Sequence, residues 1–252
     1  MNKDEILSLI GRAGSTSITT ETLEDYGLGG VDCQVCGNKG YIAKIGEDGV
    51  LRTRECACMN TRRSLRAIRS SGMADMLERY SIDNYQTPSA EYASIKDAAL
   101  DFISSPTGWF FICGQSGSGK THICTGICSE FIKRGKRTAY MLWRDESAAL
   151  KAGITDRELY ESRVKRLKTV PVLYIDDFWK VGGGQERVTG GDINLAFEIL
   201  NARYNNAALR TIISSELSLN EIIQIDEATG GRIYERSRGF VKKSPSVNWR
   251  LK

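Results

Sequence analysis

The sequence lacks any long apolar run, and its first residues lack the positive charge that begins a secretory signal peptide. No window approaches the roughly 18 consecutive apolar residues that a membrane span needs. The opening MNKDEILSLIG carries acidic residues where a signal peptide carries basic ones, and its apolar run is short. Internal repeats and low-complexity tracts are missing as well. These absences argue against a membrane or secreted protein and predict a soluble, cytoplasmic chain.

Neither sign of charge dominates the composition, because 35 basic residues stand against 31 acidic ones. The basic residues are nevertheless clustered. Six arginines and one acid lie between Arg52 and Arg69, and seven basic residues and one acid lie between Arg232 and Lys252. Such patches suit a polyanionic partner such as DNA. Solubilising surface charge explains them equally well, so both interpretations stay open.

Hydrophobic residues make up 41% of the chain, which is enough for a packed core. From about residue 90 onward, short apolar runs alternate with helical stretches. We expect strands at 109–113, 138–143, 170–175 and 211–214, and helices at 120–134, 146–168 and 192–207. This alternation predicts an α/β fold in three layers, with a parallel sheet between two layers of helices.

A glycine-rich stretch with the pattern G-x-x-x-x-G-K-[ST] follows the first of these strands and precedes a helix. Its residues are Gly114, Gln115, Ser116, Gly117, Ser118, Gly119, Lys120 and Thr121. Glycines let the backbone N–H groups point at phosphate oxygens, the lysine adds a full charge, and the threonine hydroxyl can bind Mg²⁺. A turn that binds nothing is the alternative. The strand, the lysine and the threonine together favour a site for ATP.

A second motif places two acids at the end of an apolar strand, Asp176 and Asp177 after residues 172–175. Ligands of open α/β sheets bind at the carboxyl ends of the strands. We expect Asp176 to hold Mg²⁺ through water and Asp177 to orient the attacking water. Adjacent acids can instead cap the following helix or loop. The phosphate loop at this distance favours the catalytic interpretation.

Seven cysteines are present, and four of them form two close pairs. These four are Cys33, Cys36, Cys56 and Cys58. In a reducing compartment such spacing favours metal ligation over disulfides, and four sulfurs suit tetrahedral Zn²⁺. Free thiols or a redox pair are the alternatives. The other three, Cys113, Cys124 and Cys128, fall on an apolar strand and helix, where we expect buried structural thiols.

Two regions follow from these motifs. Residues 1–72 would form a small zinc-binding region that begins with a short amphipathic helix at residues 6–10 and ends in a basic helix. Residues 73–252 would form the ATPase domain.

Taken together, these residues resemble the DnaC/DnaI helicase-loader branch of the AAA+ ATPases, a branch shared with the IstB transposition ATPases. The resemblance covers roughly residues 75–252. It is carried by the phosphate loop running into His122, the Asp176–Asp177 pair, the strand end at 213–217, the stretch 232–236 and the terminal Asn248-Trp249-Arg250.

The resemblance implies roles for several further residues. Arg236, or its neighbour Arg232, would be an arginine finger that reaches the ATP of an adjacent subunit. Arg250 would match a sensor-2-like arginine, and Ser215 or Glu216 would fall at sensor 1. Asp177 stands where most AAA+ proteins have Glu, and Glu216 where relatives often have Asn. The chain ends soon after Arg250, so we expect no helical lid domain.

By the same resemblance, the chain would be a homo-oligomer that loads a hexameric replicative helicase onto single-stranded DNA, with ATP, Mg²⁺ and Zn²⁺ as cofactors. Its size and compactness suit a phage-encoded protein. The N-terminal region would dock the helicase, and its basic helix would contact either helicase or DNA. The basic helix carries Arg62, Arg63, Arg66 and Arg69. An insertion after the second strand, with Arg144 and Lys151, would contact DNA or form a plain amphipathic helix.

Three other functions remain open. One is an IstB-type ATPase that regulates DNA transposition, although the cysteine-rich region argues against it. Another is a small-molecule kinase, for which the sequence offers neither an acceptor pocket nor a basic lid. The third is a zinc-dependent DNA-binding module that binds ATP without hydrolysing it.

Overall fold

The computed structural model describes residues 33–46, 48–69, 73–180 and 187–251, without the side chains of residues 64–69 and 74. The expected helix at residues 6–10 and the side chains of Arg66 and Arg69 lie outside the described residues. The chain divides into two compact units, Met1–Arg66 and Ala67–Lys252. The domain boundary after residue 72 stays a prediction.

The first unit contains an antiparallel hairpin and the start of a helix. Strands β1 (Tyr41–Ile45) and β2 (Leu51–Glu55) pair from Tyr41 opposite Glu55 to Ile45 opposite Leu51, and helix α3 (Cys58–Arg69) follows. Every residue of the two strands is exposed except the half-buried Ile42. A hairpin that buries so little apolar surface needs another source of stability.

The second unit is built on a five-stranded sheet in the order β4-β5-β6-β3-β7. All pairings are parallel. The strands are β3 (Trp109–Cys113), β4 (Thr138–Leu142), β5 (Val172–Asp176), β6 (Arg210–Ser215) and β7 (Val241–Lys243). The predicted parallel sheet is therefore confirmed. The short β7 was not predicted.

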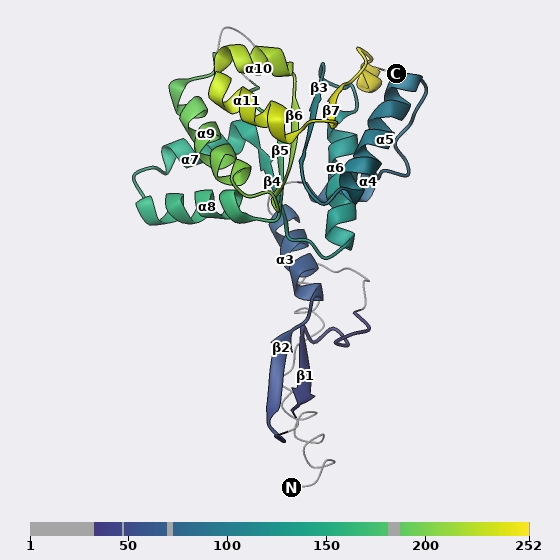
Figure 1. Ribbon diagram of the computed structural model, residues 1–252, viewed down its shortest axis with the longest axis vertical. Coiled ribbons are helices and arrows are strands. Elements are labelled where there is room, and N and C mark those ends of the chain that lie inside the picture. Colours follow the sequence, from purple (N-terminus) through teal and green to yellow (C-terminus); the bar gives the residue numbers. More distant parts are fainter. Residues whose placement is uncertain (1–32, 47, 70–72, 181–186, 252) are drawn as a thin grey trace. The chain divides into compact units, whose positions relative to one another are not determined.

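Helices cover both faces of this sheet, which confirms the three-layer α/β fold (Figure 1). One layer holds α4 (Ala74–Arg79), α5 (Ala90–Ser104) and α6 (Lys120–Lys133). The other holds α7 (Trp143–Ala152), α8 (Arg157–Thr169), α9 (Gly190–Tyr204), α10 (Leu219–Ile225) and α11 (Glu227–Arg236). Within the described ranges, no helix combines the length and the apolarity that crossing a bilayer requires.

The predicted helix at 146–168 is in fact two helices, α7 and α8. Helix α7 ends at Ala152 with Gly153 as its C-cap, and Asp156 caps α8 because its carboxylate accepts a hydrogen bond from the Leu159 N–H at 3.1 Å. A glycine ends a helix, and an aspartate N-cap begins the next one. The prediction used apolar periodicity alone and therefore joined the two helices into one.

Successive residues of β3 point to opposite helical layers. Trp109 and Phe111 belong to a buried cluster with Leu195 and Ile199 of α9, whereas the ring of Phe110 lies 5.7 Å from that of Phe102 in α5. All five residues of the strand are buried. Burial on both faces explains why these strands appear in the sequence as continuous apolar runs rather than as alternating ones.

Candidate nucleotide site and cysteine cluster

The glycine-rich loop connects β3 to α6 at the carboxyl edge of the sheet. Gly119 is the N-cap of α6 and has φ +92°, a left-handed value that other residues rarely adopt. Helix α6 begins at Lys120, so its free N–H groups face the loop. This is the arrangement that a bound phosphate requires.

The Lys120 side chain is 5% exposed and lies inside the loop. Its Nζ donates hydrogen bonds to the carbonyl oxygens of Gly114 at 2.7 Å and Gln115 at 2.9 Å. Burial lowers the pKa of Lys120, and the nearby carboxylates of Asp177, Glu216 and Asp176 oppose this effect. An anionic phosphate in the loop would give the buried ammonium a full counter-charge.

A pocket of about 250 Å³ opens beside the loop. It brings together nine of the predicted site residues: Ser116, Gly117, Ser118, Gly119, Lys120, Thr121, His122, Asp177 and Arg250. Of the residues predicted for the nucleotide site, those that do not line it are Gly114, Gln115, Asp176, Ser215 and Arg236. The loop and one member of the acid pair therefore face a common space, although β6 lies between their strands.

Asp176 is 4% exposed, and several donors hold its carboxylate. Tyr174 donates its hydroxyl to Oδ1 at 2.6 Å, Tyr140 donates to Oδ2 at 3.1 Å, and Ser214 also donates to Oδ1. The Asp177 N–H lies 3.1 Å from the same Oδ1. These three hydroxyl residues, which sequence reasoning missed, fix the carboxylate at the strand end. A signal was present, because Tyr174 stands two residues before Asp176 and so shares its face.

Asp177 adopts φ +51° and begins a tight turn. Its Oδ2 lies 3.0 Å from the ammonium of Lys180, which in turn lies 2.9 Å from Oε1 of Glu216. Lys180 also lines the pocket. Lys180 belongs to no sequence motif and was not predicted, because its contacts depend on how the turn after β5 folds.

The two candidates for sensor 1 differ in position. Ser215 is buried and donates its hydroxyl to the carbonyl oxygen of Phe178 at 2.8 Å, so it does not face the pocket. Glu216 is the next residue, and through Lys180 it is connected to Asp177. Of the two, only Glu216 has a link to the pocket.

The three arginines named from the sequence occupy different places. Arg250 lies beside the loop, with its Nη1 3.5 Å from Ser116 Oγ. Arg232 packs over the Phe197 ring and donates from Nε to Asn201 Oδ1 at 3.0 Å. Arg236 lies 6.0 Å from the ring of Trp109, the first residue of β3. It is therefore at the opposite end of β3 from the phosphate loop of its own chain.

An aromatic wall of Tyr80, Tyr85, Tyr92, His122 and Trp249 completes the pocket. The rings of Tyr80 and His122 stack at 4.7 Å, and the Trp249 indole N–H donates to the Tyr92 hydroxyl at 3.0 Å. Burial lowers the pKa of His122, which favours a neutral ring. Such flat surfaces suit the base of a nucleotide. Only His122 was predicted here, since the others come from separate segments.

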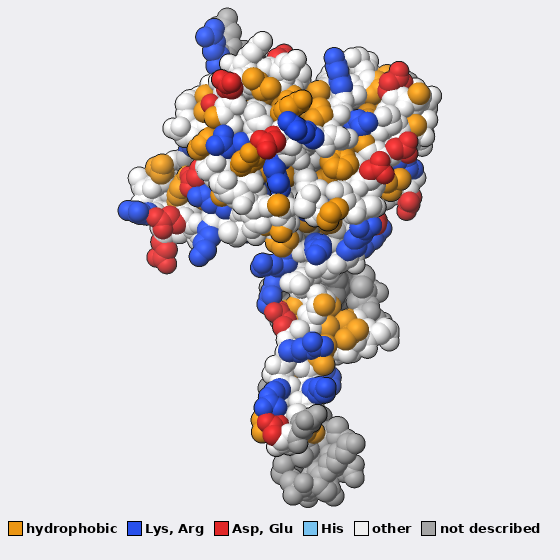
Figure 2. Space-filling view, viewed as in Figure 1, with side chains coloured by type: hydrophobic (Ala, Val, Ile, Leu, Met, Phe, Trp, Pro, Cys, Tyr) orange, Lys and Arg blue, Asp and Glu red, His pale blue; other side chains and the backbone are white. Residues whose placement is uncertain are grey.

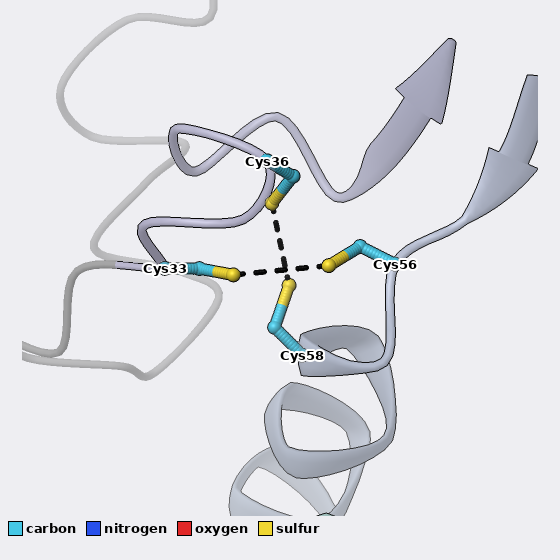
Figure 3. A group of neighbouring side chains, drawn as sticks. All are labelled: Cys33, Cys36, Cys56 and Cys58. Carbon is cyan, nitrogen blue, oxygen red and sulfur yellow. Dashed lines mark hydrogen bonds between the residues drawn. The ribbon is translucent and has the colours of Figure 1, made fainter. Parts of the chain in front are cut away.

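The four clustered cysteines of the first unit point at a common centre (Figure 3). All four sulfurs lie within 4.8 Å of one another, with Cys33 Sγ 3.7 Å from Cys56 Sγ and Cys36 Sγ 3.6 Å from Cys58 Sγ. Zn–S bonds of about 2.3 Å in a tetrahedron require sulfurs about 3.8 Å apart. Hydrogen bonding by the Cys36 backbone lowers the pKa of Cys33 to about 7, whereas burial raises the pKa of Cys58. The cluster fits zinc.

Basic side chains gather on the surface of the first unit (Figure 2). Arg52 and Arg54 are exposed on β2, but Arg52 pairs with Asp48 at 2.6 Å. Arg63 pairs with Glu55 at 2.5 Å, and Arg62 is only 4% exposed. Part of the basic stretch is thus internal or neutralised.

The other three thiols, Cys113, Cys124 and Cys128, are buried in the second unit and form no disulfide, as expected.

Several known proteins are similar to this chain. YqaM of Bacillus subtilis (strain 168) is 30% identical over 75% of the chain, a match that spans only 62% of YqaM. XkdC of the phage-like element PBSX in the same organism is 28% identical over 83% of the chain and 81% of XkdC. The replicative helicase loader DnaC of Escherichia coli (strain K12) is 25% identical over 52% of the chain and 56% of DnaC.

Among solved structures, that of the DnaC helicase loader superimposes with a TM-score of 0.56 at 22% identity, covering 67% of this chain and 98% of that one. This likeness shows that the two proteins share a fold. The family model of the IstB-like ATP-binding proteins matches residues 42–229, well over half of the chain. The chain therefore belongs to the IstB-like ATP-binding proteins, the AAA+ family related to the DnaC and DnaI helicase loaders.

Proposed function

We propose that this protein hydrolyses ATP in order to load a replicative helicase onto single-stranded DNA. One observation carries the ATPase part of the proposal: the phosphate loop with Lys120 and the carboxylate of Asp177 face one pocket at the carboxyl edge of the sheet. The loader part is supported by the similarity to the replicative helicase loader DnaC, and the similarity to a protein of a phage-like element supports a phage origin.

In this proposal, each residue of the site has a distinct task. The N–H groups of the loop and Lys120 bind the phosphates. The Thr121 hydroxyl would ligate Mg²⁺ and Asp176 would hold the ion through water, and the ion would neutralise charge on the phosphates. Asp177 accepts a hydrogen bond from the attacking water and aligns it. The aromatic wall covers the base of the nucleotide, and Arg250 covers the phosphate loop.

The position of Arg236 supports action between subunits. The five residues of β3 separate Trp109 from the loop by about 16 Å at 3.3 Å per residue, too far for Arg236 to reach its own ATP. A homo-oligomer would place Arg236 of one subunit at the ATP of the next. Its Nε and Nη2 are buried without a hydrogen-bond partner, and contact with the ATP of a neighbour would require the guanidinium to turn outward.

We further propose that residues 1–72, with zinc held by the four cysteines, bind the hexameric helicase.

Arg144 and Lys151 would contact single-stranded DNA. Both line a cavity of about 460 Å³ in the second unit, together with Arg187. Lys151 pairs there with Asp192 at 2.8 Å, so Arg144 and Arg187 are the stronger candidates for contacts with phosphates.

The test combines the purified chain, the helicase of its host and a single-stranded DNA circle. We expect helicase to be transferred to the circle only with ATP, and Lys120→Ala to abolish both ATP binding and transfer.

The name of the matched family favours an IstB-type transposition ATPase as a second candidate. Failure to bind the helicase in any nucleotide state, with DNA-stimulated hydrolysis intact, would favour that function instead.

A further inference from the structure

Lys180 lies at the end of the turn after β5, and its ammonium joins two acidic side chains. Its Nζ lies 3.0 Å from Asp177 Oδ2 and 2.9 Å from Glu216 Oε1. Burial lowers the pKa of Lys180, but hydrogen bonds with Glu216 and Asp177 outweigh this and raise it. A charged lysine therefore bridges the acids that follow β5 and β6.

The turn that carries this bridge is held rigidly. Asp177 and Trp179 both have left-handed φ values, +51° and +55°, which are costly for residues other than glycine. The turn is fixed by the hydrogen bond from Phe178 N–H to Ser214 O at 2.8 Å and by the complete burial of the Phe178 ring. Strain that persists because the surroundings enforce it often marks a functional position.

We propose that Lys180 is a positioning residue that restrains Asp177 in the resting protein. The inference rests on the proposed ATPase function. A carboxylate oxygen that accepts a hydrogen bond from an ammonium is a weaker acceptor for the proton of a water molecule. While Lys180 bridges Asp177 and Glu216, Asp177 is therefore poorly placed to align the attacking water.

Lys180 also lies in the wall between two cavities. One is the pocket at the phosphate loop, and the other is the cavity lined by Arg144, Lys151 and Arg187. A phosphodiester bound in the second cavity would compete with Asp177 and Glu216 for the Lys180 ammonium. Single-stranded DNA in this cavity would thereby release Asp177 and stimulate hydrolysis.

The test compares Lys180→Met with Lys133→Met in the full-length chain. Lys133 is a matched control, because it also pairs with an acid three residues away, Glu130 at 2.7 Å, but lies outside both cavities. We expect Lys180→Met to raise ATP turnover without DNA by about three- to tenfold, the effect of losing one half-buried ion pair. Stimulation by a single-stranded oligonucleotide should disappear, and affinity for ATP should stay unchanged.

Other outcomes would overturn the inference. Lower turnover with weaker ATP binding would make Lys180 a direct phosphate ligand, and retained stimulation by DNA would remove the coupling. Lys180→Arg preserves the charge and should keep basal turnover low, which a purely structural role of the lysine stem does not require. A wild-type chain that shows no turnover with or without DNA would instead overturn the proposed function itself.

Discussion

Ser214 and Ser215 are adjacent on β6, yet their hydroxyls have unrelated partners. Ser214 donates to the carboxylate of Asp176, and Ser215 donates to the backbone carbonyl of Phe178. Successive side chains of a strand point to opposite faces, so only one of two adjacent serines can contact the site. The sequence located this strand end correctly. It could not show whether Ser214 or Ser215 faces the site, because that depends on how β6 pairs with the neighbouring strand β5.

At the same scale, His122 should make folding depend on pH. Burial lowers the pKa of His122, although the hydrogen bond with the Ser81 carbonyl opposes this. In the unfolded chain its pKa is about 6.5, so the unfolded state takes up the proton first as pH falls. The stability that depends on neutral His122 is complete above that pH and is lost as pH falls below it toward the folded pKa.

We therefore expect the free energy of unfolding to fall more steeply between pH 7.5 and 5.5 for the wild type than for His122→Gln. Urea unfolding at both pH values measures the difference. The comparison is clean because the chain contains a single histidine. Parallel losses in the two proteins would contradict the assignment.

At the scale of elements, the buried strands and the phosphate loop could be predicted, because each is a contiguous pattern. Strands β3 and β5 are unbroken apolar runs, and the loop carries its glycines, lysine and threonine in eight consecutive residues. The hairpin and β7 expose most of their residues and have no such pattern. The aromatic wall and the donors to Asp176 come together only through tertiary folding.

The segment after β7 lies on the phosphate loop, and Gly117 is where they meet. The Trp249 N–H donates to Gly117 O at 2.9 Å, and a Cβ on Gly117 would lie 2.1 Å from Asn248 Oδ1. Gly135 is a matched control, because it has a similar φ, +71° against +75°, but nothing within 4 Å of a Cβ.

We expect Gly135→Ala to lower the free energy of unfolding by about 1 kcal/mol, the cost of a left-handed φ. Gly117→Ala should cost about 1–2 kcal/mol more, because Asn248 must give up its hydrogen bond with the Arg250 N–H. Urea unfolding measures both. Measured in an Asn248→Ala background, where that hydrogen bond is already absent, Gly117→Ala should cost only about as much as the control substitution. Equal costs for the two glycine variants in the wild-type background would disprove the contact.

The zinc cluster offers a prediction for the first unit alone. Cys56 is 3% exposed within a unit whose strands are almost entirely exposed. Structural zinc sites contribute about 10–16 kcal/mol at neutral pH, which exceeds what such a hairpin gains from packing. Cys56→Ser should lose the metal and unfold the hairpin, while the sheet of the second unit stays folded.

Metal analysis should find one zinc per wild-type chain, and limited proteolysis should cut the variant within residues 41–55. Ala57→Ser is the control, since Ala57 is exposed between two ligands and contributes no sulfur. A metal-free wild-type chain that resists the protease equally well would rule out a structural role for zinc.

At the scale of the whole molecule, the two ends of the sheet have separate roles in the proposed mechanism. The carboxyl edge holds the phosphate loop and the acids, and Arg236 lies near Trp109 at the other end of β3. In this proposed mechanism, the ATP pocket and the arginine finger of one subunit would lie too far apart to act together. Only an assembly in which these surfaces meet would be complete.

This division leads to a complementation test. Arg236→Ala should bind ATP normally but lose about a thousandfold in turnover, the scale on which arginine fingers act. Lys120→Ala should fail to bind ATP and keep its finger. A mixture of these two inactive proteins should regain activity, because a Lys120→Ala subunit can supply its arginine to the intact pocket of an Arg236→Ala neighbour.

Arg238→Ala serves as the control, since Arg238 is exposed and lies 5.7 Å from the Tyr234 ring. If the mixture remains inactive while ATP binding by Arg236→Ala is intact, Arg236 does not act between subunits.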